Sequence, residues 1–436
     1  MKRTLLVFLV ILLFICSFSS VCFAQEEDTY ELPSLDSVRS FAIYNIENDF
    51  YVASKNENLS VAPASTVKIM SGLLICEALS GKENETVTLT SEMLFGSTGK
   101  TFGLTATTRL TIKDLMIIAF SGGYNDAVNA LACIVSGSTV EFVKRMNERC
   151  KILGMRSTHY ENATGLDSPL MSTTLKDTLK VAAEASKIPL FLEVSSHFTY
   201  VVNFAGGGSK TVYGSNLLMD ENSVYFCRSA KGMNSGMTDA GGACLVTYAE
   251  HKGAKYAVVA MGCPEDDTRF ALVQDSLQYA YDNYSYHVYL EKGSGVGNFP
   301  VELSDVGTNA LIVLDEDLTY FAKNGHTPNQ MRVVLSFYGE LKAPIKAGES
   351  VGYCTLWDGE ELCCTVNVTV KTDVERSAFL AYMSSVRGYL GGRAFVASLV
   401  CAIVLTLVAI FLPRVALKMR QRKRKYVRSR GGFKLK

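Results

Sequence analysis

The chain has 436 residues, of which 43 are basic and 43 acidic, so its formal net charge is zero. Its length allows two domains. The five histidines are scattered, and no two of the twelve cysteines have a metal-ligand spacing such as C-x-x-C, which excludes the usual zinc sites. We therefore expect no metal and no other cofactor.

The N-terminus has the pattern of a secretory signal. Lys2 and Arg3 precede an apolar core at residues 5–15, and small residues ending at Ala24 give a cleavage site. We expect residues 1–24 to be removed during export. An uncleaved membrane anchor is the alternative.

A strand-like run at residues 41–45 is followed by an S-x-x-K motif that begins at Ser65 and ends at Lys68. Pro63 suits the first turn of a helix, and residues three apart share a helix face, so the hydroxyl and the amine can meet. Lysine can take the proton of a serine nucleophile once burial or a nearby cation lowers its pKa. The motif alone also fits an ordinary helix start.

The rest of the first 290 residues mixes helices and strands. Apolar residues at the helical period predict helices over residues 112–120, 127–135, 140–153 and 177–186. Runs of β-branched and aromatic residues predict strands over residues 196–202, 241–248 and 256–261. We expect residues 25–290 to form an α/β (α+β) domain, with helices packed on a sheet.

A change of composition marks the next part of the chain. Residues 289–300 are rich in glycine and are predicted to be a linker. Residues 300–375 are predicted to form a small all-β, β-sandwich-like domain, with strands at 310–314, 331–337, 352–357 and 362–370. We find no catalytic constellation in this domain.

The C-terminal part has the features of a membrane anchor. Residues 376–393 place apolar side chains on one helical face, which predicts an amphipathic juxtamembrane segment on the membrane surface, with a plain stalk as the alternative. Residues 394–412 carry no charge and are long enough for a transmembrane helix. Residues 413–436 hold eleven basic and no acidic side chains, which predicts a cytoplasmic tail.

The part expected outside the membrane is acidic. When the tail, Lys2, Arg3 and Arg393 are set aside, 29 basic residues remain against 43 acidic ones, a net charge of −14. This balance is unfavourable for binding nucleic acid, so we expect no nucleic-acid partner. The expected location is the cell membrane, with a single pass and the first domain outside the cytoplasm.

From Ser40 to the C-terminal anchor, the chain resembles the D-alanyl-D-alanine carboxypeptidases, a family of penicillin-binding serine peptidases. This family carries three motifs, S-x-x-K, S-x-N and K-T-G. The first is intact in residues 63–70. The resemblance implies a β-lactamase/transpeptidase-like domain with an antiparallel sheet and helices, followed by a small all-β domain and a C-terminal transmembrane helix.

The second motif departs from the family pattern. When the chain is aligned on Asn125, Gly123 stands where the family has serine. The resemblance implies that Asn125 bridges Lys68 and a carbonyl of the substrate. The missing hydroxyl is expected to be replaced by Ser121 or by a water molecule.

The third motif also departs from the pattern. Asn234 stands where the family has lysine, and the resemblance makes this strand substrate-binding through Asn234, Ser235, Gly236, Met237 and Thr238. Asparagine lacks the positive charge that anchors a terminal carboxylate. Lys231 should point to the opposite strand face unless a bulge intervenes. The N–H groups of Ser65 and Met237 are expected to form the oxyanion hole.

The resemblance implies a serine-type carboxypeptidase that removes terminal D-alanine from peptidoglycan stem peptides through an acyl-enzyme on Ser65, and that β-lactam antibiotics inhibit covalently. Because of Gly123 and Asn234, a catalytically impaired homologue that binds the wall or acts as a scaffold is the alternative. A β-lactamase-like hydrolase is a third hypothesis, but no E-x-x-L-N segment follows the second motif.

Overall fold

A computed structural model describes residues 31–305, 308–326, 328 and 330–430. The expected signal at residues 1–24 lies outside the described residues. The chain divides into two compact units, the first comprising Met1–His287 and Phe321–Thr327, and the second Val288–Tyr320 and Pro328–Lys436.

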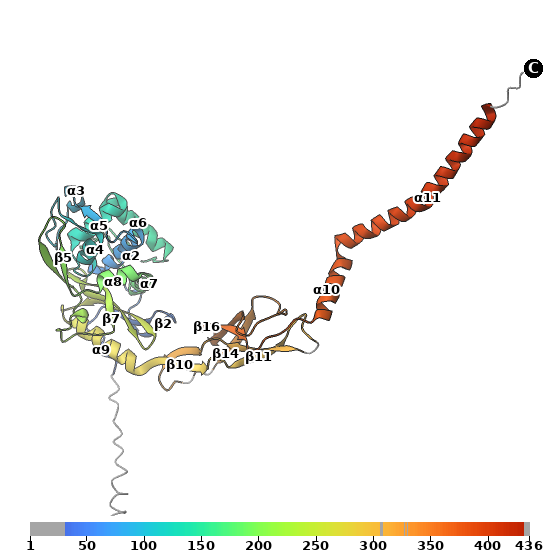
Figure 1. Ribbon diagram of the computed structural model, residues 1–436. Coiled ribbons are helices and arrows are strands. Elements are labelled where there is room, and N and C mark those ends of the chain that lie inside the picture. Colours follow the sequence, from blue (N-terminus) through green and yellow to red (C-terminus); the bar gives the residue numbers. More distant parts are fainter. Residues whose placement is uncertain (1–30, 306–307, 327, 329, 431–436) are drawn as a thin grey trace, which may run out of the picture. The chain divides into compact units, whose positions relative to one another are not determined.

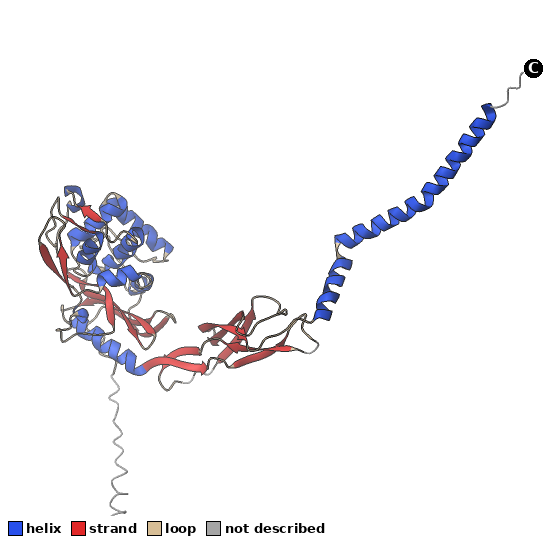
Figure 2. Ribbon diagram, in the orientation of Figure 1, coloured by secondary structure: helices blue, strands red, loops and turns tan. Residues whose placement is uncertain are grey.

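The first unit is built on an antiparallel five-stranded sheet (Figures 1 and 2). From edge to edge its strands are β2 (Phe50–Lys55), β1 (Ser40–Asn45), β9 (Ala254–Cys263), β8 (Gly242–His251) and β7 (Ala230–Thr238). Both faces are buried: Ala42 belongs to one hydrophobic core, and its neighbours Phe41 and Ile43 belong to the other. This alternation follows from the strand geometry, which points successive side chains to opposite faces.

Helices cover both faces of this sheet. The core on one face is formed with α2 (Val67–Leu79), α4 (Ile112–Phe120), α5 (Asn125–Ser136), α6 (Thr139–Ile152), α7 (Leu175–Ala185) and α8 (Pro189–Ser195). The core on the other face is formed with α9 (Thr268–Asn283). Most residues of α2 are buried, so the helix that begins at the S-x-x-K motif lies in the centre of the larger core.

Short elements complete this unit. Two hairpin-like pairs are β3 (Thr86–Thr88) with β4 (Arg109–Thr111), and β5 (Thr199–Asn203) with β6 (Ser209–Tyr213). The short helices are η1 (Ala64–Thr66), α3 (Ser91–Leu94) and η2 (Leu217–Met219). The predicted helices and strands of this domain are present, with ends that differ by a few residues.

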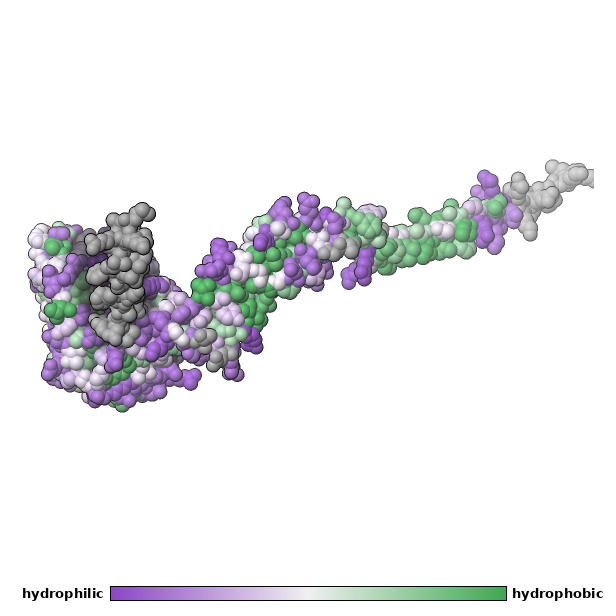
Figure 3. All heavy atoms as spheres, turned by 90° about the horizontal axis from the view of Figure 1, so that it is seen from below, coloured by the Kyte–Doolittle hydropathy of each residue, from purple (hydrophilic) through white to green (hydrophobic). Residues whose placement is uncertain are grey.

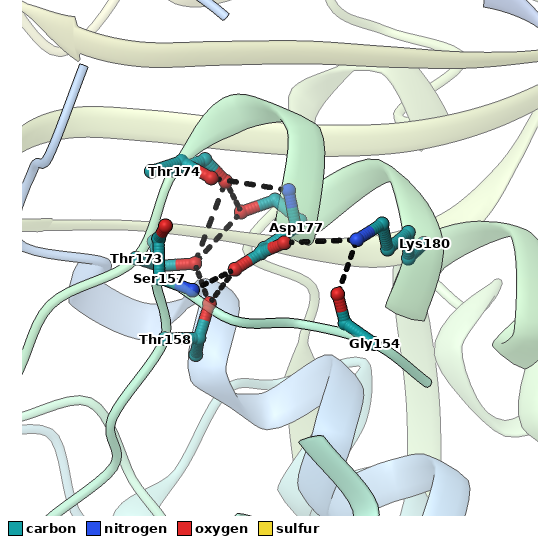
Figure 4. Close-up of polar contacts among 8 residues, drawn as sticks. Gly154, Ser157, Thr158, Thr173, Thr174, Asp177 and Lys180 are labelled. Carbon is teal, nitrogen blue, oxygen red and sulfur yellow. Dashed lines mark hydrogen bonds and ion pairs between the residues drawn. The ribbon is translucent and has the colours of Figure 1, made fainter. Parts of the chain in front are cut away.

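A buried carboxylate at the start of α7 fixes the loop that follows α6 (Figure 4). Asp177 Oδ2 accepts hydrogen bonds from Ser157 N at 2.8 Å and Thr158 Oγ1 at 2.9 Å, and Asp177 Oδ1 lies 3.2 Å from Lys180 Nζ. The Thr174 side chain caps α7 by accepting from Asp177 N. The loop held in this way continues to Thr164, which lies at the site described below.

The second unit holds an antiparallel sheet of five strands. In order they are β11 (Gly295–Pro300), β12 (Asn309–Leu314), β16 (Glu361–Val370), β15 (Ser350–Asp358) and β14 (Met331–Phe337). A separate two-stranded sheet joins β10 (Tyr284–Leu290) and β13 (Leu318–Lys323), and the residues of both strands are divided between the two units. The expected all-β domain is confirmed.

The prediction of a linker at residues 289–300 is wrong, because this stretch contains the end of β10 and all of β11. Its apolar residues Val296 and Phe299 pack against the core of the second unit. The glycines that suggested a linker accompany a register shift between Gly295 and Gly297. A glycine inside a strand is typical of such an irregularity.

Two helices follow the second sheet, α10 (Ala378–Gly391) and α11 (Arg393–Arg430). Within α11, residues Phe395–Lys423 are long and apolar enough to cross a membrane, and none of the apolar window is buried. Figure 3 shows an apolar surface along this helix that gives way to hydrophilic residues toward its end. The predicted span at 394–412 falls almost entirely within this stretch, although the helix continues well into the basic tail.

Candidate active site

The first motif lies where η1 continues into α2. Ser65 belongs to η1 and Lys68 to the first turn of α2. Lys68 Nζ lies 3.1 Å from Ser65 Oγ and donates a second hydrogen bond, of 2.6 Å, to the carbonyl oxygen of Thr164. The contact predicted from the spacing of the motif is therefore present.

The environment of Lys68 favours its neutral form. The side chain is buried, with 1% of its surface exposed. Burial, and to a lesser extent the positive charge of Lys100, lowers the pKa of Lys68 to about 7. A lysine with this pKa is largely neutral just above neutral pH, so it can accept the Ser65 proton.

The backbone before Ser65 has an unusual conformation. Ala64 has a φ of +47°, a region that favours glycine. Such a residue costs about 1–3 kcal/mol and persists where the surrounding structure fixes it. The turn is closed here by a 2.6 Å hydrogen bond from Thr66 Oγ1 to the carbonyl oxygen of Pro63. The strain is thus located next to the candidate nucleophile.

Ser65 opens onto a cleft of about 320 Å³ in the first unit. Residues from the three motif segments line it, namely Ser65, Gly123, Asn125, Ser235, Gly236, Met237 and Thr238. Sheet topology explains their meeting: β7 is an edge strand, and η1 packs against it. The cleft therefore runs beside an open strand edge, where an extended peptide can pair.

Gly236 lies very close to the nucleophile. A Cβ placed on it would lie 2.5 Å from both Ser65 Oγ and Ser65 Cβ. Carbon atoms do not approach so closely, so a side chain at this position would displace Ser65. This explains in physical terms why the third motif needs glycine here.

In the second motif, Asn125 begins α5 and faces the cleft. Its Nδ2 donates a 2.8 Å hydrogen bond to the carbonyl oxygen of Thr98, and its buried Oδ1 has no protein partner among the described residues. A buried amide oxygen without a partner is free to accept a hydrogen bond from a ligand.

The geometry does not support Ser121 as the replacement for the missing motif hydroxyl. Its Oγ donates to the carbonyl oxygen of His197, and Ser121 is not among the residues that line the cleft. Gly123 does line the cleft, with a φ of +75°. The nearest side chain to a Cβ built there belongs to Ser215, whose Oγ would be 3.5 Å away.

In the third motif, Asn234 is buried and, unlike the other four residues predicted to bind substrate there, is not among the residues that line the cleft. Its Nδ2 donates a 3.3 Å hydrogen bond to the carbonyl oxygen of Phe120. The strand contains a register irregularity between Lys231 and Asn234, so a bulge does occur. Even so, Lys231 does not reach the cleft, because its ammonium pairs with Glu250.

Several other residues line the cleft that are not predicted from the sequence. They are Gly99 and Lys100 between α3 and β4, Thr164 to Leu166 after α6, Ser215 after β6, and Asp266 and Arg269 at the start of α9. Arg269 is buried and pairs with Asp266, Nη1 to Oδ1, at 2.7 Å. None of these residues belongs to a motif, so only the folded chain brings them to Ser65.

The model of the D-alanyl-D-alanine carboxypeptidase family matches residues 35–265, and that of the penicillin-binding protein 5 C-terminal domain matches residues 284–376. D-alanyl-D-alanine carboxypeptidase DacF of Bacillus subtilis is 27% identical over 393 residues, which cover 89% of this chain and 98% of the relative. D-alanyl-D-alanine carboxypeptidase DacA of Haemophilus influenzae is 25% identical, with 78% and 86% covered.

Solved structures share the fold. Penicillin-binding protein 5 from Haemophilus influenzae superposes with a TM-score of 0.59 at 22% identity, covering 79% of this chain and 99% of its own. A peptidoglycan synthesis regulatory factor from Streptococcus pneumoniae gives a TM-score of 0.68 at 20% identity, covering 78% and 99%. The expected penicillin-binding fold is thus confirmed. Because the family model spans more than half of the sequence, the chain belongs to the D-alanyl-D-alanine carboxypeptidase family.

Proposed function

We propose that this chain removes the terminal D-alanine from peptidoglycan stem peptides through an acyl-enzyme on Ser65. The observation that carries the proposal is the 3.1 Å contact between Ser65 Oγ and the buried Lys68 Nζ at the wall of the cleft. The two relatives described above support the reaction, since both are named D-alanyl-D-alanine carboxypeptidases.

The first half of the reaction forms an ester. Neutral Lys68 takes the proton of Ser65 Oγ, which attacks the carbonyl carbon of the penultimate D-alanine. The N–H groups of Ser65 and Met237 stabilise the negative charge on the carbonyl oxygen. The bond between carbonyl carbon and nitrogen then breaks, and the proton held by Lys68 goes to the amine of the departing D-alanine.

The second half releases the shortened peptide. A water molecule takes the place of the departed D-alanine, loses a proton to Lys68 and attacks the ester carbonyl. The bond to Ser65 Oγ breaks, and the proton returns to this oxygen. A β-lactam would acylate Ser65 by the same attack, with its ring amide in place of the peptide bond.

The cleft offers suitable contacts for an extended peptide. The edge strand β7 presents Ser235, Gly236, Met237 and Thr238 along one side. Asn125, with its unpartnered Oδ1, lies on the same cleft. We assign the strand residues to backbone pairing with the substrate and Asn125 to the substrate amide.

Unless other residues of the cleft supply the missing charge and hydroxyl, the two motif departures should slow turnover without abolishing it. Asn234 cannot provide the charge of the family's lysine, and Gly123 cannot provide a hydroxyl. The loss of one charge-assisted hydrogen bond typically costs about 1.5–3 kcal/mol, or roughly a ten- to hundredfold weaker interaction. The nucleophile and its base are unaffected, and so activity rather than a purely structural role is the better interpretation.

We also propose a single membrane pass with the catalytic unit outside the cytoplasm. The apolar stretch of α11 is long enough to span a bilayer, and the eleven basic residues beyond position 412 favour the cytoplasmic side. An epitope tag at the C-terminus tests this topology. It should be protected from protease in intact spheroplasts and cleaved after lysis, and cleavage before lysis would contradict it.

The reaction is tested with diacetyl-L-lysyl-D-alanyl-D-alanine as substrate and free D-alanine as the product measured. The wild-type chain should release D-alanine, and the Ser65→Ala variant should not. If the wild type releases none but binds the peptide, the chain is a wall-binding protein without carboxypeptidase activity.

A further inference from the structure

The cations nearest to the third motif are already engaged. Lys231, three residues before Asn234, is paired with Glu250 on the neighbouring strand. Arg269 lines the cleft, but its charge is partly offset by Asp266 at 2.7 Å. Lys100 and Arg269 are the cations that line the cleft, and of these two only Arg269 has an ion-pair partner among the described residues.

Lys100 lines the same cleft from the loop between α3 and β4. No carboxylate of the described residues lies within ion-pair distance of its ammonium. Its Nζ lies 4.8 Å from the centre of the Tyr124 ring, a cation–π contact that holds a positive charge in place. Among the described residues, Lys100 is thus a cation without an ion-pair partner that lines the same cleft as the nucleophile.

The second motif itself fixes the loop that carries Lys100. Asn125 N donates a 2.7 Å hydrogen bond to the carbonyl oxygen of Lys100, and Asn125 Nδ2 bonds Thr98 O at 2.8 Å. The carboxylate of Asp126 accepts bonds of 2.9 to 3.0 Å from the N–H groups of residues 102–104. Bonds on both sides of Lys100 therefore hold its backbone at the cleft.

From this arrangement, and resting on the proposed function, we propose that Lys100 supplies the positive charge that Asn234 lacks in the third motif. The ammonium attracts the terminal carboxylate of the substrate, or the carboxylate of a penicillin, into the cleft. It also lies close enough to Lys68 to lower the pKa of that base. Burial lowers the pKa of Lys100 itself, and the nearby carboxylate of Asp266 partly offsets this effect and so favours the charged ammonium.

The direct test separates binding from chemistry. In a Ser65→Ala background, diacetyl-L-lysyl-D-alanyl-D-alanine and its C-terminal amide are titrated by NMR. Adding Lys100→Met should weaken binding of the acid about tenfold and leave the amide within about twofold. Lys100→Arg should keep the preference for the acid. The control is Lys144→Met, which removes an exposed ammonium on α6 that is paired with Glu141.

A second test asks whether the charge can be returned to its family position. Asn234→Lys should restore the rate of acylation by penicillin in a Lys100→Met chain. The same change should raise the acylation rate of the wild type much less. Two changes that act on one charge site are expected to be non-additive in this way. Lys100→Met should also move the pH profile of acylation to higher pH, since the pKa of Lys68 rises when the nearby cation is lost.

The outcomes are distinct. If Lys100→Met weakens binding of the acid and of the amide equally, or weakens neither, the assignment of Lys100 is wrong. If Asn234→Lys improves both backgrounds by the same factor, the two positions act independently and the charge has not been relocated. Failure of the wild type to be acylated would instead overturn the proposed function, and the binding comparison would still decide the role of Lys100.

A separate observation concerns the hydroxyl missing from the second motif. Ser215 lines the cleft, and its Oγ lies 3.5 Å from the point where a Cβ of residue 123 would be. Ser215 N donates a 2.9 Å hydrogen bond to the carbonyl oxygen of Ser121, and Ser215 Oγ donates a longer one, of 3.4 Å, to the same oxygen. We infer that the Ser215 hydroxyl turns from this carbonyl toward the cleft, takes the place of the motif serine and hydrogen-bonds the nitrogen of the departing D-alanine.

The test is Ser215→Ala, with Ser215→Thr as the variant that keeps the hydroxyl. Alanine should lower kcat for D-alanine release about tenfold with little change in KM, and threonine should recover most of the rate. Ser209→Ala, at an exposed position of β6, is the control. A kcat within about twofold of wild type for Ser215→Ala would overturn the assignment.

Discussion

Gly236 on the edge strand β7 faces Ser65 so closely that a Cβ there would lie 2.5 Å from the serine oxygen. The strand and the nucleophile therefore have no room for a side chain between them. This relationship connects the sheet topology to the chemistry, because substrate must enter between the β7 edge and the start of α2.

The first prediction follows directly. Gly236→Ala should reduce acylation of Ser65 by a fluorescent penicillin by about a hundredfold or more, because displacement of a reacting group by about 1 Å has effects of this size. Gly206→Ala is the matched control, since a Cβ there meets no atom within 4 Å. Near-normal labelling of Gly236→Ala would show that a side chain at position 236 does not displace Ser65.

The second prediction concerns the pH dependence of acylation. Because the pKa of Lys68 is about 7, the base is protonated below this value and neutral above it. The rate of acylation by benzylpenicillin should fall about tenfold per unit below pH 6 and level off above about pH 8. Stopped-flow measurements across pH 5–9 give the profile, and a rate that does not change with pH would contradict the role of Lys68.

The third prediction concerns stability. A lysine whose pKa is lower in the folded state than in the unfolded chain opposes folding fully below the folded value, and this penalty disappears as pH rises toward the unfolded value. Between pH 7 and about 10.5 the change for Lys68 is on the order of 4–5 kcal/mol.

The matching variant is Lys68→Met. It should be inactive yet more stable than the wild type in urea at pH 6–7, with the difference shrinking toward pH 10. The difference between the two chains isolates Lys68 from other titrating groups. A difference in stability that is constant with pH would contradict the lowered pKa.

The fourth prediction concerns the second motif. Gly123 has a φ of +75°, where a serine is strained by about 1–2 kcal/mol. Gly123→Ser should therefore lower the free energy of unfolding by about this amount and should not by itself raise activity. A stable and markedly faster Gly123→Ser variant would show that the hydroxyl was missing after all and that Ser215 does not replace it.

The fifth prediction tests the network of Figure 4. Asp177→Ala removes the acceptor of the Ser157 N–H and one of the two partners of the Thr158 hydroxyl, which should destabilise the fold by about 2–4 kcal/mol. It should also loosen the loop that presents Thr164 O to Lys68, and so slow acylation. Glu148→Ala, at an exposed position of α6, should change neither property.

Much of the fold could be predicted because its signals are local. The helix over residues 112–120 has the predicted ends, and the strand at residues 331–337 does as well. The contact of Ser65 with Lys68 follows from three-residue spacing on a helix. The prediction of a linker at the glycine-rich residues 289–300 is wrong because these glycines accompany an irregularity within a strand.

The rest of the site depends on contacts between distant segments. Thr164 reaches Lys68 across 96 positions, and Ser215 lies beside Gly123 only because the loops after β6 and α4 meet. Lys100 has no sequence feature that separates it from other exposed lysines. Its proposed role becomes evident only from the structure, in which Lys231, the lysine nearest in sequence to Asn234, is paired with Glu250.

The most direct test of the whole account is intact-mass spectrometry after incubation with benzylpenicillin, followed by peptide mapping. The account predicts a single penicilloyl group, located on Ser65, that is absent from Ser65→Ala and Lys68→Met. No mass increase in a folded wild-type chain, or modification of a different residue, would contradict it.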